Sequence, residues 1–287
     1  MKLTVLVATY NRSIIIEKCL SALSLQNDKD FEVIVLDQSD DLNTRNLLHN
    51  RFPFFKYQHF NEKGKSIVLN KALLSIKSDI ICITDDDCVP DKDWIKKIKG
   101  FFINNREREI VTGRVIAGEI EEDAVMSKLN DEIDKPTCYQ KNKITPIFIL
   151  SGCNMAFRYC LINEIGEFNN NFGPGSKFKS SDDNEWSYRL LIKGKKIYYE
   201  PDIIVIHRSW RKDSDDIKQT KEYGFSAGAF FSIIFDHSLT DFIFHLKNIF
   251  KWILHEIIKG SISNKKKALL YIRYFFIGFL IKKYEKK

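Results

Sequence analysis

The chain has 287 residues, of which 44% are hydrophobic and 29% are charged, so it can bury a sizeable core and does not resemble a disordered protein. Gly and Pro are scarce, at 13 and 6 residues, which argues against a long flexible linker. The net charge of +7 comes from the end of the chain, because residues 242–287 hold eleven Lys and Arg against two Glu. Such a basic tail suits anionic lipid, nucleic acid or phosphorylated molecules.

The six cysteines predict neither a zinc site nor a disulfide framework. None of them forms a Cys-x-x-Cys pair, and several, such as Cys82, lie in apolar runs. We therefore expect reduced core cysteines in a cytosolic protein. Residues 1–8 lack the pattern of a signal peptide, and no uninterrupted apolar stretch reaches the roughly eighteen residues of a membrane-spanning helix.

Apolar runs and amphipathic segments alternate over the first hundred residues. Strands are predicted at 3–8, 31–36, 54–59 and 80–83, and helices at 13–26, 42–50, 65–76 and 91–102, with Ser13 as a candidate helix cap. Continuous apolar strands that alternate with helices are typical of a parallel sheet covered on both faces. We therefore predict an α/β fold with a mostly parallel central sheet.

The remaining chain continues this pattern and then changes. Further strands are predicted at 110–117, 147–158, 195–199 and 203–206, and a helix at 181–192, while 119–146 is polar and fits no element. A polar stretch near 210–220 predicts a boundary, followed by a dense apolar segment at 225–235 and helical segments at 242–259 and 269–281. These features predict an α/β domain over residues 1–215 and a helical extension over residues 216–287.

Three adjacent carboxylates, Asp85 to Asp87, directly follow the strand predicted at 80–83. Ligands gather at the carboxyl ends of parallel strands, and adjacent carboxylates repel one another unless a cation or hydrogen-bond donors are present. A divalent metal ion that also binds substrate phosphates meets this requirement. The alternative is a turn that caps the next helix, because Asp is a good turn residue.

Five short motifs, in this order, resemble those of family 2 glycosyltransferases, which have the GT-A fold. They are Val7–Arg12, Val33–Asp40, Thr84–Asp87 in the place of the DxD motif, Gly152–Arg158 and Ser181–Leu190, followed in step by Gly194, Pro201 and His207. The resemblance covers about residues 1–210, and it implies a nucleotide-sugar-binding half over 1–110 and an acceptor half over 111–215. Two positions depart from the family's pattern. Asp182 stands where Glu is usual. Leu69 stands where Arg is common, so a diphosphate contact is either missing or supplied by Lys65 or Lys71.

The resemblance also implies a role for individual residues. Asp183 would be the catalytic base, and Asp87 with His207 would hold a divalent metal, Mn²⁺ or Mg²⁺. The donor would be bound by Thr9, Tyr10, Asn11, Arg12, Asp37, Lys65, Asp85 and Asp86, and the acceptor by Asn154, Asp182 and Trp186. Plainer explanations stay open at several of these positions. Thr9 and Asp37 could cap the segments that follow them, and His207 could be an ordinary histidine at a strand end.

Two further features concern the acceptor side. Trp186 and Phe172 could form an apolar platform for a sugar ring, and Gly173 to Lys177 could form a mobile loop over the acceptor.

Sugar transfer requires a base for the acceptor hydroxyl and stabilisation of the leaving diphosphate. We therefore predict a glycosyltransferase that moves a sugar from a nucleotide-diphosphate donor to an acceptor glycan, and the resemblance implies that the reaction inverts the anomeric carbon. We expect this acceptor to be lipid-linked and to belong to polysaccharide or lipopolysaccharide biosynthesis at the cell surface.

Two other classes stay open. A nucleotidyltransferase also combines a nucleotide site with metal-binding carboxylates, but its Gly-rich signature is replaced here by Asn11-Arg12. A non-catalytic scaffold that binds glycans at a membrane is the second alternative, although the carboxylates at 85–87 and Asp183 argue against it.

The basic tail is rich in aromatic residues, and its polar residues form a narrow stripe on the helix predicted at 242–259. This pattern favours a helix at an anionic membrane interface, hence a peripheral protein on the inner face of the cell membrane. The alternative is a helical pair that packs on the catalytic domain or on a second copy of the chain. Nucleic acid is not an expected partner, because the aromatics form one face rather than scattered stacking platforms.

Overall fold

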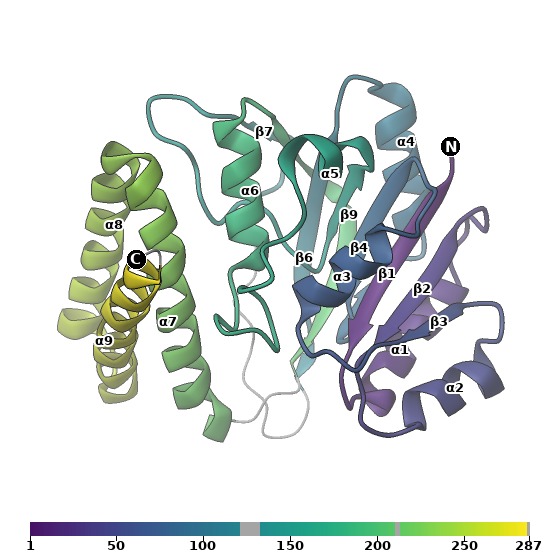
Figure 1. The fold of residues 1–287 in the computed structure, drawn as a ribbon, viewed down its shortest axis with the longest axis horizontal. Coiled ribbons are helices and arrows are strands. Elements are labelled where there is room, and N and C mark those ends of the chain that lie inside the picture. Colours follow the sequence, from purple (N-terminus) through teal and green to yellow (C-terminus); the bar gives the residue numbers. More distant parts are fainter. Residues whose placement is uncertain (121–132, 210–212, 286–287) are drawn as a thin grey trace.

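The computed structural model describes residues 1–120, 133–209 and 213–285. Figure 1 shows an α/β body beside a group of C-terminal helices. Parts of the polar segment at 119–146, of the boundary at 210–220 and of the basic tail lie outside the described residues.

The first half of the body is the predicted parallel α/β unit. Strands β1 (Leu3–Thr9), β2 (Glu32–Asp37), β3 (Lys56–His59) and β4 (Ile80–Asp85) pair in parallel in the order β3-β2-β1-β4. Helices α1 (Ser13–Ser24), α2 (Asn43–Arg51) and α3 (Lys65–Leu73) connect them. Ser13 is the first helical residue of α1 rather than its cap, and Arg12, which precedes it, makes no capping hydrogen bond with its side chain.

The second half of the body differs from the prediction of a mostly parallel sheet. The sheet continues from β4 with β8 (Met155–Arg158), β6 (Ile110–Ile120), β9 (Ile197–Ser209) and β5 (Cys88–Pro90), in that order. A further strand, β7 (Thr137–Tyr139), pairs with β9. Here β6 and β9 are parallel, whereas β8 runs antiparallel to both β4 and β6, and β5 and β7 run antiparallel to β9. The helices of this half are α4 (Trp94–Asn104), α5 (Cys160–Ile165) and α6 (Asp182–Ile192).

Two strand predictions in this half are corrected. Only residues 155–158 of the segment predicted at 147–158 form a strand, and the two strands predicted at 195–206 are one strand, β9. Apolar content alone predicts burial, but it carries no information on strand direction, which depends on partners distant in the sequence.

Helices cover both faces of the sheet, as predicted. Alternate side chains of β1 point to opposite faces. Val5 and Val7 pack with buried residues of α1, α2 and α4, whereas Leu6 packs with buried residues of α3, α5 and α6. Three of the six cysteines, Cys19, Cys82 and Cys88, are buried as expected, whereas Cys138 and Cys160 are exposed.

The C-terminal helices are α7 (Asp213–His237), α8 (Leu239–Lys259) and α9 (Ile262–Tyr284). The backbones of α7 and α9 approach closely, since a Cβ atom on Gly228 would lie 1.8 Å from the carbonyl oxygen of Phe275. A third core cluster joins residues of α7 and α9 to Phe172, Phe178 and Tyr188 of the body. The extension therefore packs on the body, and its division from the body at residue 215 stays a prediction. Within the described residues, no helix has the length and apolarity needed to cross a bilayer.

Candidate active site

The predicted site residues of the first half meet at one edge of the sheet. Strands β1, β2 and β4 are parallel, so their carboxyl ends lie together. In the register of these strands Thr9 is opposite Asp37, and Ala8 is opposite Asp85. The parallel pairing thus brings residues from three sequence motifs to one place.

Asp40 connects the turns that follow β1 and β2. Its carboxylate accepts hydrogen bonds from the Tyr10 hydroxyl (2.8 Å) and the Asn11 amide (3.1 Å), and it pairs with Lys63 at 2.6 Å. The hydrogen bonds from Lys63, Tyr10 and Asn11 lower the pKa of Asp40 to about 2. Asp40 was not among the residues predicted to bind the donor, although its place in the motif Val33–Asp40 was a signal.

Tyr10 stays 47% exposed, with the Lys63 ammonium 4.5 Å from its ring centroid. The ring is therefore fixed at its hydroxyl and open on its surface, as a ring that stacks on a nucleobase must be. Asn11 adopts φ 52°, which turns the chain between β1 and α1.

Two predicted donor contacts are internal in this conformation. Asp37 is completely buried, where it accepts hydrogen bonds from the Ser39 backbone N–H and the Tyr57 hydroxyl. Thr9 is also buried, and its hydroxyl donates to Asp86 at 2.7 Å. Asp37 thus caps the segment that follows it, which is the plainer of its two explanations, and Thr9 holds Asp86, while donor contacts by these two residues stay a prediction.

Asp86 is held between β1 and Arg12. One of its oxygens accepts from Thr9 and the other pairs with Arg12 at 3.0 Å. Burial raises the pKa of Asp86 to about 6, although Arg12 acts in the opposite direction. Asp86 and Arg12, both expected to bind the donor, thus form an ion pair with each other.

Asp87 and His207 lie together, as the metal prediction requires. Cys88 pairs with His207 across β5 and β9, and the His207 Nε2 atom lies 3.6 Å from an Asp87 oxygen. The ligand atoms of Asp87, Cys88 and His207 all lie within 4.8 Å of one another. Carboxylate and imidazole suit Mn²⁺, whereas burial raises the pKa of the Cys88 thiol well above its usual value and keeps it a poor ligand. The residues present therefore fit a divalent metal.

Lys65 connects this cluster to the acceptor side. Its ammonium pairs with Asp85 and lies 3.4 Å from the Gly152 carbonyl oxygen. Burial opposes its charge, but the carboxylates of Asp85, Asp182 and Asp183 raise the pKa of Lys65 above its usual value. Of the two lysines expected to contact the diphosphate, Lys65 lies at this site, whereas Lys71 pairs with Glu62 at an exposed position.

Asp183 lies at the start of α6, where the Gly152 backbone N–H donates to its Oδ2 at 3.0 Å. Burial, and next the neighbouring Asp182, raise the pKa of Asp183 to about 7. A carboxylate with this pKa can accept a proton near neutral pH. A Cβ atom on Gly152 would lie 3.2 Å from the same oxygen, so a glycine leaves room for the carboxylate.

Three predicted acceptor residues are parts of the core instead. Trp186 is completely buried against Phe157 and Phe168, and Phe172 is completely buried as well. Asn154 is completely buried, and its side chain bonds to the Trp94 indole and to the carbonyl oxygens of Arg114 and Ile203. Neither an aromatic platform made by Trp186 and Phe172 nor an acceptor contact by Asn154 is present, because large rings and a multiply bonded amide stabilise the interior here.

The loop that follows Phe172 contacts the site through its backbone. The Pro174 carbonyl accepts from the Lys65 N–H at 2.9 Å, and Lys177 pairs with Glu285 of the C-terminal extension. Asp182 is next to the same loop, since a Cβ atom on Gly173 would lie 3.0 Å from its carboxyl carbon. Mobility of this loop stays a prediction.

Comparison with known proteins agrees with this geometry. The profile described as "Glycosyl transferase family 2" matches residues 4–166, more than half of the chain. YdaM of Bacillus subtilis, described as a probable glycosyltransferase, is 25% identical over 235 residues, which cover 76% of this chain and 52% of that protein. The GalNAc(5)-diNAcBac-PP-undecaprenol beta-1,3-glucosyltransferase of Campylobacter jejuni is 29% identical over 92 residues, which cover 30% of this chain and 29% of that protein. The chain thus spans about half or less of these relatives' lengths.

A solved structure shares the fold. The mannosyltransferase of Pyrobaculum calidifontis, in complex with GDP-Man and Mn²⁺, matches with a TM-score of 0.64 at 18% identity, covering 99% of this chain and 87% of that one. The fold is therefore that of the GT-A glycosyltransferases, with the C-terminal helices included in the match. From the matched profile and the motifs at the sheet edge, we conclude that the chain belongs to glycosyl transferase family 2.

Proposed function

We propose that the protein transfers a sugar from a nucleotide-diphosphate-sugar to a saccharide acceptor, with inversion at the anomeric carbon. The observation that carries this proposal is the arrangement around Lys65. Asp87, which follows β4, lies 3.6 Å from His207 of β9, and a carboxylate with a pKa near neutrality, Asp183, lies at the start of α6. Lys65 lies between Asp85 and the pair Asp182 and Asp183.

Asp183 and Lys65 have different roles in the proposed reaction. Asp183 takes the proton of the acceptor hydroxyl as the acceptor oxygen bonds to the anomeric carbon and the bond to the diphosphate oxygen breaks. Attack from the face opposite the leaving group inverts that carbon. The buried ammonium of Lys65 is placed to offset the charge of the leaving diphosphate.

Asp87 and His207 would hold a divalent metal, Mn²⁺ or Mg²⁺. When bound, such an ion neutralises charge that develops on the diphosphate. Tyr10 would stack on the base, because its ring is half exposed and its hydroxyl is fixed by Asp40. The proposed donor side also includes Asn11, Arg12, Asp85 and Asp86. Thr9 and Asp37 help to position it, because Thr9 donates to Asp86 and Asp37 accepts from the Ser39 N–H.

The acceptor is proposed to be lipid-linked, like the undecaprenol-linked compound in the name of the C. jejuni relative. Helices α8 and α9 support this proposal because they expose many large apolar residues beside lysines. The exposed apolar residues are Leu239, Ile243, Phe244, Phe250, Trp252, Leu254, Ile257, Ile258, Ile262, Leu269, Phe276, Ile277, Leu280, Ile281 and Tyr284. Apolar residues interspersed with cations suit an anionic bilayer surface, and so we place the protein at the inner face of the cell membrane.

The two other classes fit less well. A nucleotidyltransferase is disfavoured because Asn11-Arg12 stands after the first strand in place of its Gly-rich signature. A non-catalytic scaffold has no use for buried carboxylates such as Asp86 and Asp87, since burying charge is costly.

The test is calorimetric binding of UDP and of GDP, each with and without Mn²⁺. We expect one of them to bind only with the metal, and Asp87→Ala to abolish this binding. Asp202→Asn, which removes an exposed carboxylate on β9, is the matched control and is expected to bind like the unchanged protein. If the folded protein bound neither nucleotide with Mn²⁺, the proposed donor site would be wrong.

A further inference from the structure

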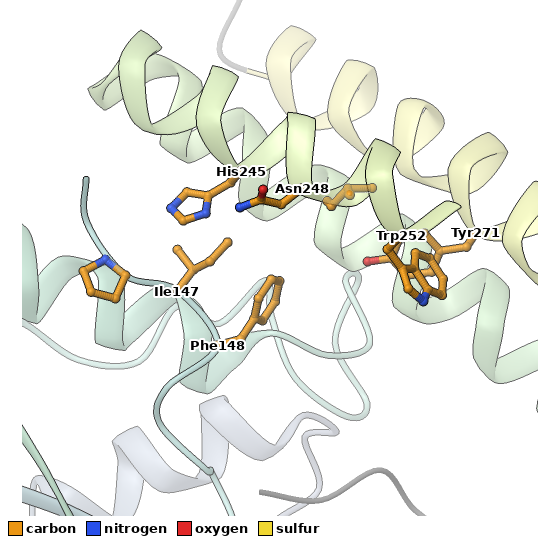
Figure 2. A pocket seen from close by; sticks show the side chains of 8 residues that line it. Ile147, Phe148, His245, Asn248, Trp252 and Tyr271 are labelled. Atoms are coloured by element: carbon orange, nitrogen blue, oxygen red, sulfur yellow. The ribbon is translucent and has the colours of Figure 1, made fainter. Parts of the chain in front are cut away.

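A cavity of about 460 Å³ lies away from the carboxylates, between the segment at 146–148 and helices α8 and α9. This volume is within the range of sites that bind small molecules. Figure 2 shows the side chains that surround it. The lining residues are Pro146, Ile147, Phe148, His245, Asn248, Ile249, Trp252 and Tyr271.

The cavity is fixed from both sides by hydrogen bonds. The Asp241 carboxylate of α8 accepts from the Thr145 N–H at 3.1 Å, and the His245 Nε2–H donates to the Thr145 carbonyl oxygen at 2.8 Å. Asp241 also accepts from Tyr188 of α6, the helix that begins beside Asp183. The wall at 146–148 is therefore held in place before any ligand arrives, which lowers the entropic cost of binding.

Phe148 is in an unusual conformation. Its φ of 59° lies in the left-handed region, which a bulky residue rarely adopts, and its ring stays 47% exposed at the cavity. Trp252 and Tyr271 form a second aromatic wall, with ring centroids 5.3 Å apart and rings nearly perpendicular. The C–H faces of a sugar ring pack well on such aromatic walls.

Two polar groups at the cavity decide between a saccharide and a hydrocarbon. Asn248 is exposed and Tyr271 is partly exposed, and among the described residues none forms a hydrogen bond with the Tyr271 hydroxyl or the Asn248 side chain, so both groups are open to a ligand. Burial raises the pKa of Tyr271 to about 12, so the hydroxyl keeps its proton and can donate. A saccharide presents hydroxyls that can pair with both groups, whereas a hydrocarbon chain offers them neither a donor nor an acceptor.

The cavity is also within reach of the proposed base. Phe148 precedes Gly152 by four residues, and the Gly152 N–H donates to Asp183. Four residues span at most about 14 Å, so a saccharide of a few linked rings can extend from the cavity to Asp183.

We propose that this cavity is a binding subsite for the saccharide of the acceptor, several rings away from the hydroxyl that receives the new sugar. The inference rests on the proposed glycosyl transfer. Phe148 and Trp252 supply the apolar walls, and Asn248 and Tyr271 supply the hydrogen bonds.

The test uses the full chain in a Trp210→Phe background. Trp94 and Trp186 are completely buried, so Trp252 reports on the cavity through its fluorescence. Free trisaccharides of glucose, of galactose and of N-acetylglucosamine are titrated singly. We expect at least one to change the emission saturably, and Asn248→Ala and Tyr271→Phe each to raise its dissociation constant roughly three- to tenfold, the loss of one hydrogen bond.

Phe250→Ala is the matched control, since it removes an exposed aromatic of α8 that does not line the cavity, and its dissociation constant should be unchanged. Phe148→Gly adds an independent check. It removes the ring and relieves the left-handed backbone, so binding should weaken without a fall in melting temperature. The proposal would be overturned if no trisaccharide bound, or if binding were insensitive to both polar variants.

Saturable binding of farnesyl phosphate, with no response to the trisaccharides, would identify a hydrocarbon site and would also overturn the proposal. Binding of UDP or GDP with Mn²⁺ is measured on the same samples. If a nucleotide binds but no saccharide does, the subsite is wrong while the proposed function stands. If no nucleotide binds, the failure is that of the proposed function.

Discussion

The His207 imidazole lies 3.6 Å from the Asp87 carboxylate, because β5 pairs with the far end of β9. If both side chains hold the metal, His207→Ala should raise the Mn²⁺ concentration that half-saturates nucleotide binding by at least about tenfold, since one ligand is lost. Calorimetric titrations at a series of Mn²⁺ concentrations measure this value. His255→Ala, on the exposed surface of α8, is the control, and an unchanged half-saturation in His207→Ala would remove this residue from the metal site.

The raised pKa of Asp183 should determine how kcat/KM depends on pH. As the base it must be deprotonated, and burial together with Asp182 raises its pKa to about 7. We therefore expect kcat/KM to fall about tenfold per pH unit below pH 7. Asp182→Asn removes the like charge and should move this fall to lower pH, while Asp183→Asn should lose at least about a hundredfold in kcat. A profile that Asp182→Asn leaves in place would argue against this assignment.

The same shift has a consequence for stability. Because the folded-state pKa of Asp183 lies above its ordinary value of 3.8, the folded protein binds more protons than the unfolded chain between these values. The resulting stabilisation is present at low pH and is lost as the pH rises through about 7. Asp183→Asn should therefore raise the melting temperature more at pH 8 than at pH 5, which thermal unfolding at both pH values measures.

A substitution at Gly152 should impair catalysis without affecting donor binding. A Cβ atom there would lie 3.2 Å from the Asp183 Oδ2 atom and would displace the carboxylate. Gly152→Ala should lower kcat about tenfold or more, because small misplacements of a base are costly, while metal-dependent nucleotide binding is unchanged. Gly100→Ala in α4, where an added Cβ meets nothing within 4 Å, is the control. Full activity of Gly152→Ala would show that the position of Asp183 is not critical.

The exposed apolar residues of α8 lead us to expect that the protein binds anionic vesicles. Leu254→Ser and Ile258→Ser together should lower the partition coefficient on phosphatidylglycerol vesicles by roughly tenfold, because apolar area that enters the interface is lost. Ile14→Ser is the control, since Ile14 is 83% exposed on α1 and far from α8 in the sequence. Vesicle sedimentation measures bound protein, and equal loss in the control and the double variant would exclude a specific membrane face.

The parallel half of the fold follows from local sequence signals. Apolar strands such as Leu3–Thr9 alternate with helices, and this alternation leaves few arrangements other than a parallel sheet with both faces covered. Parallel pairing then places Asp85 to Asp87 beside the turns after β1 and β2. The grouping of these carboxylates at one edge and the family were therefore predictable, while the metal-binding role of Asp87 stays a prediction.

Other features depend on contacts between distant segments. The antiparallel insertion of β8, the burial of Asn154 and Trp186, and the internal position of Asp37 were not predictable, because a polar or aromatic residue in a motif can face either the core or the ligand. Sequence by itself determined which residue types are present and the parallel order of the first strands. The tertiary structure alone decided that Lys65 joins Asp85 to the carboxylates of α6, and that Phe148, Asn248 and Tyr271 surround one cavity, because side-chain direction and burial are set by packing between elements distant in the chain.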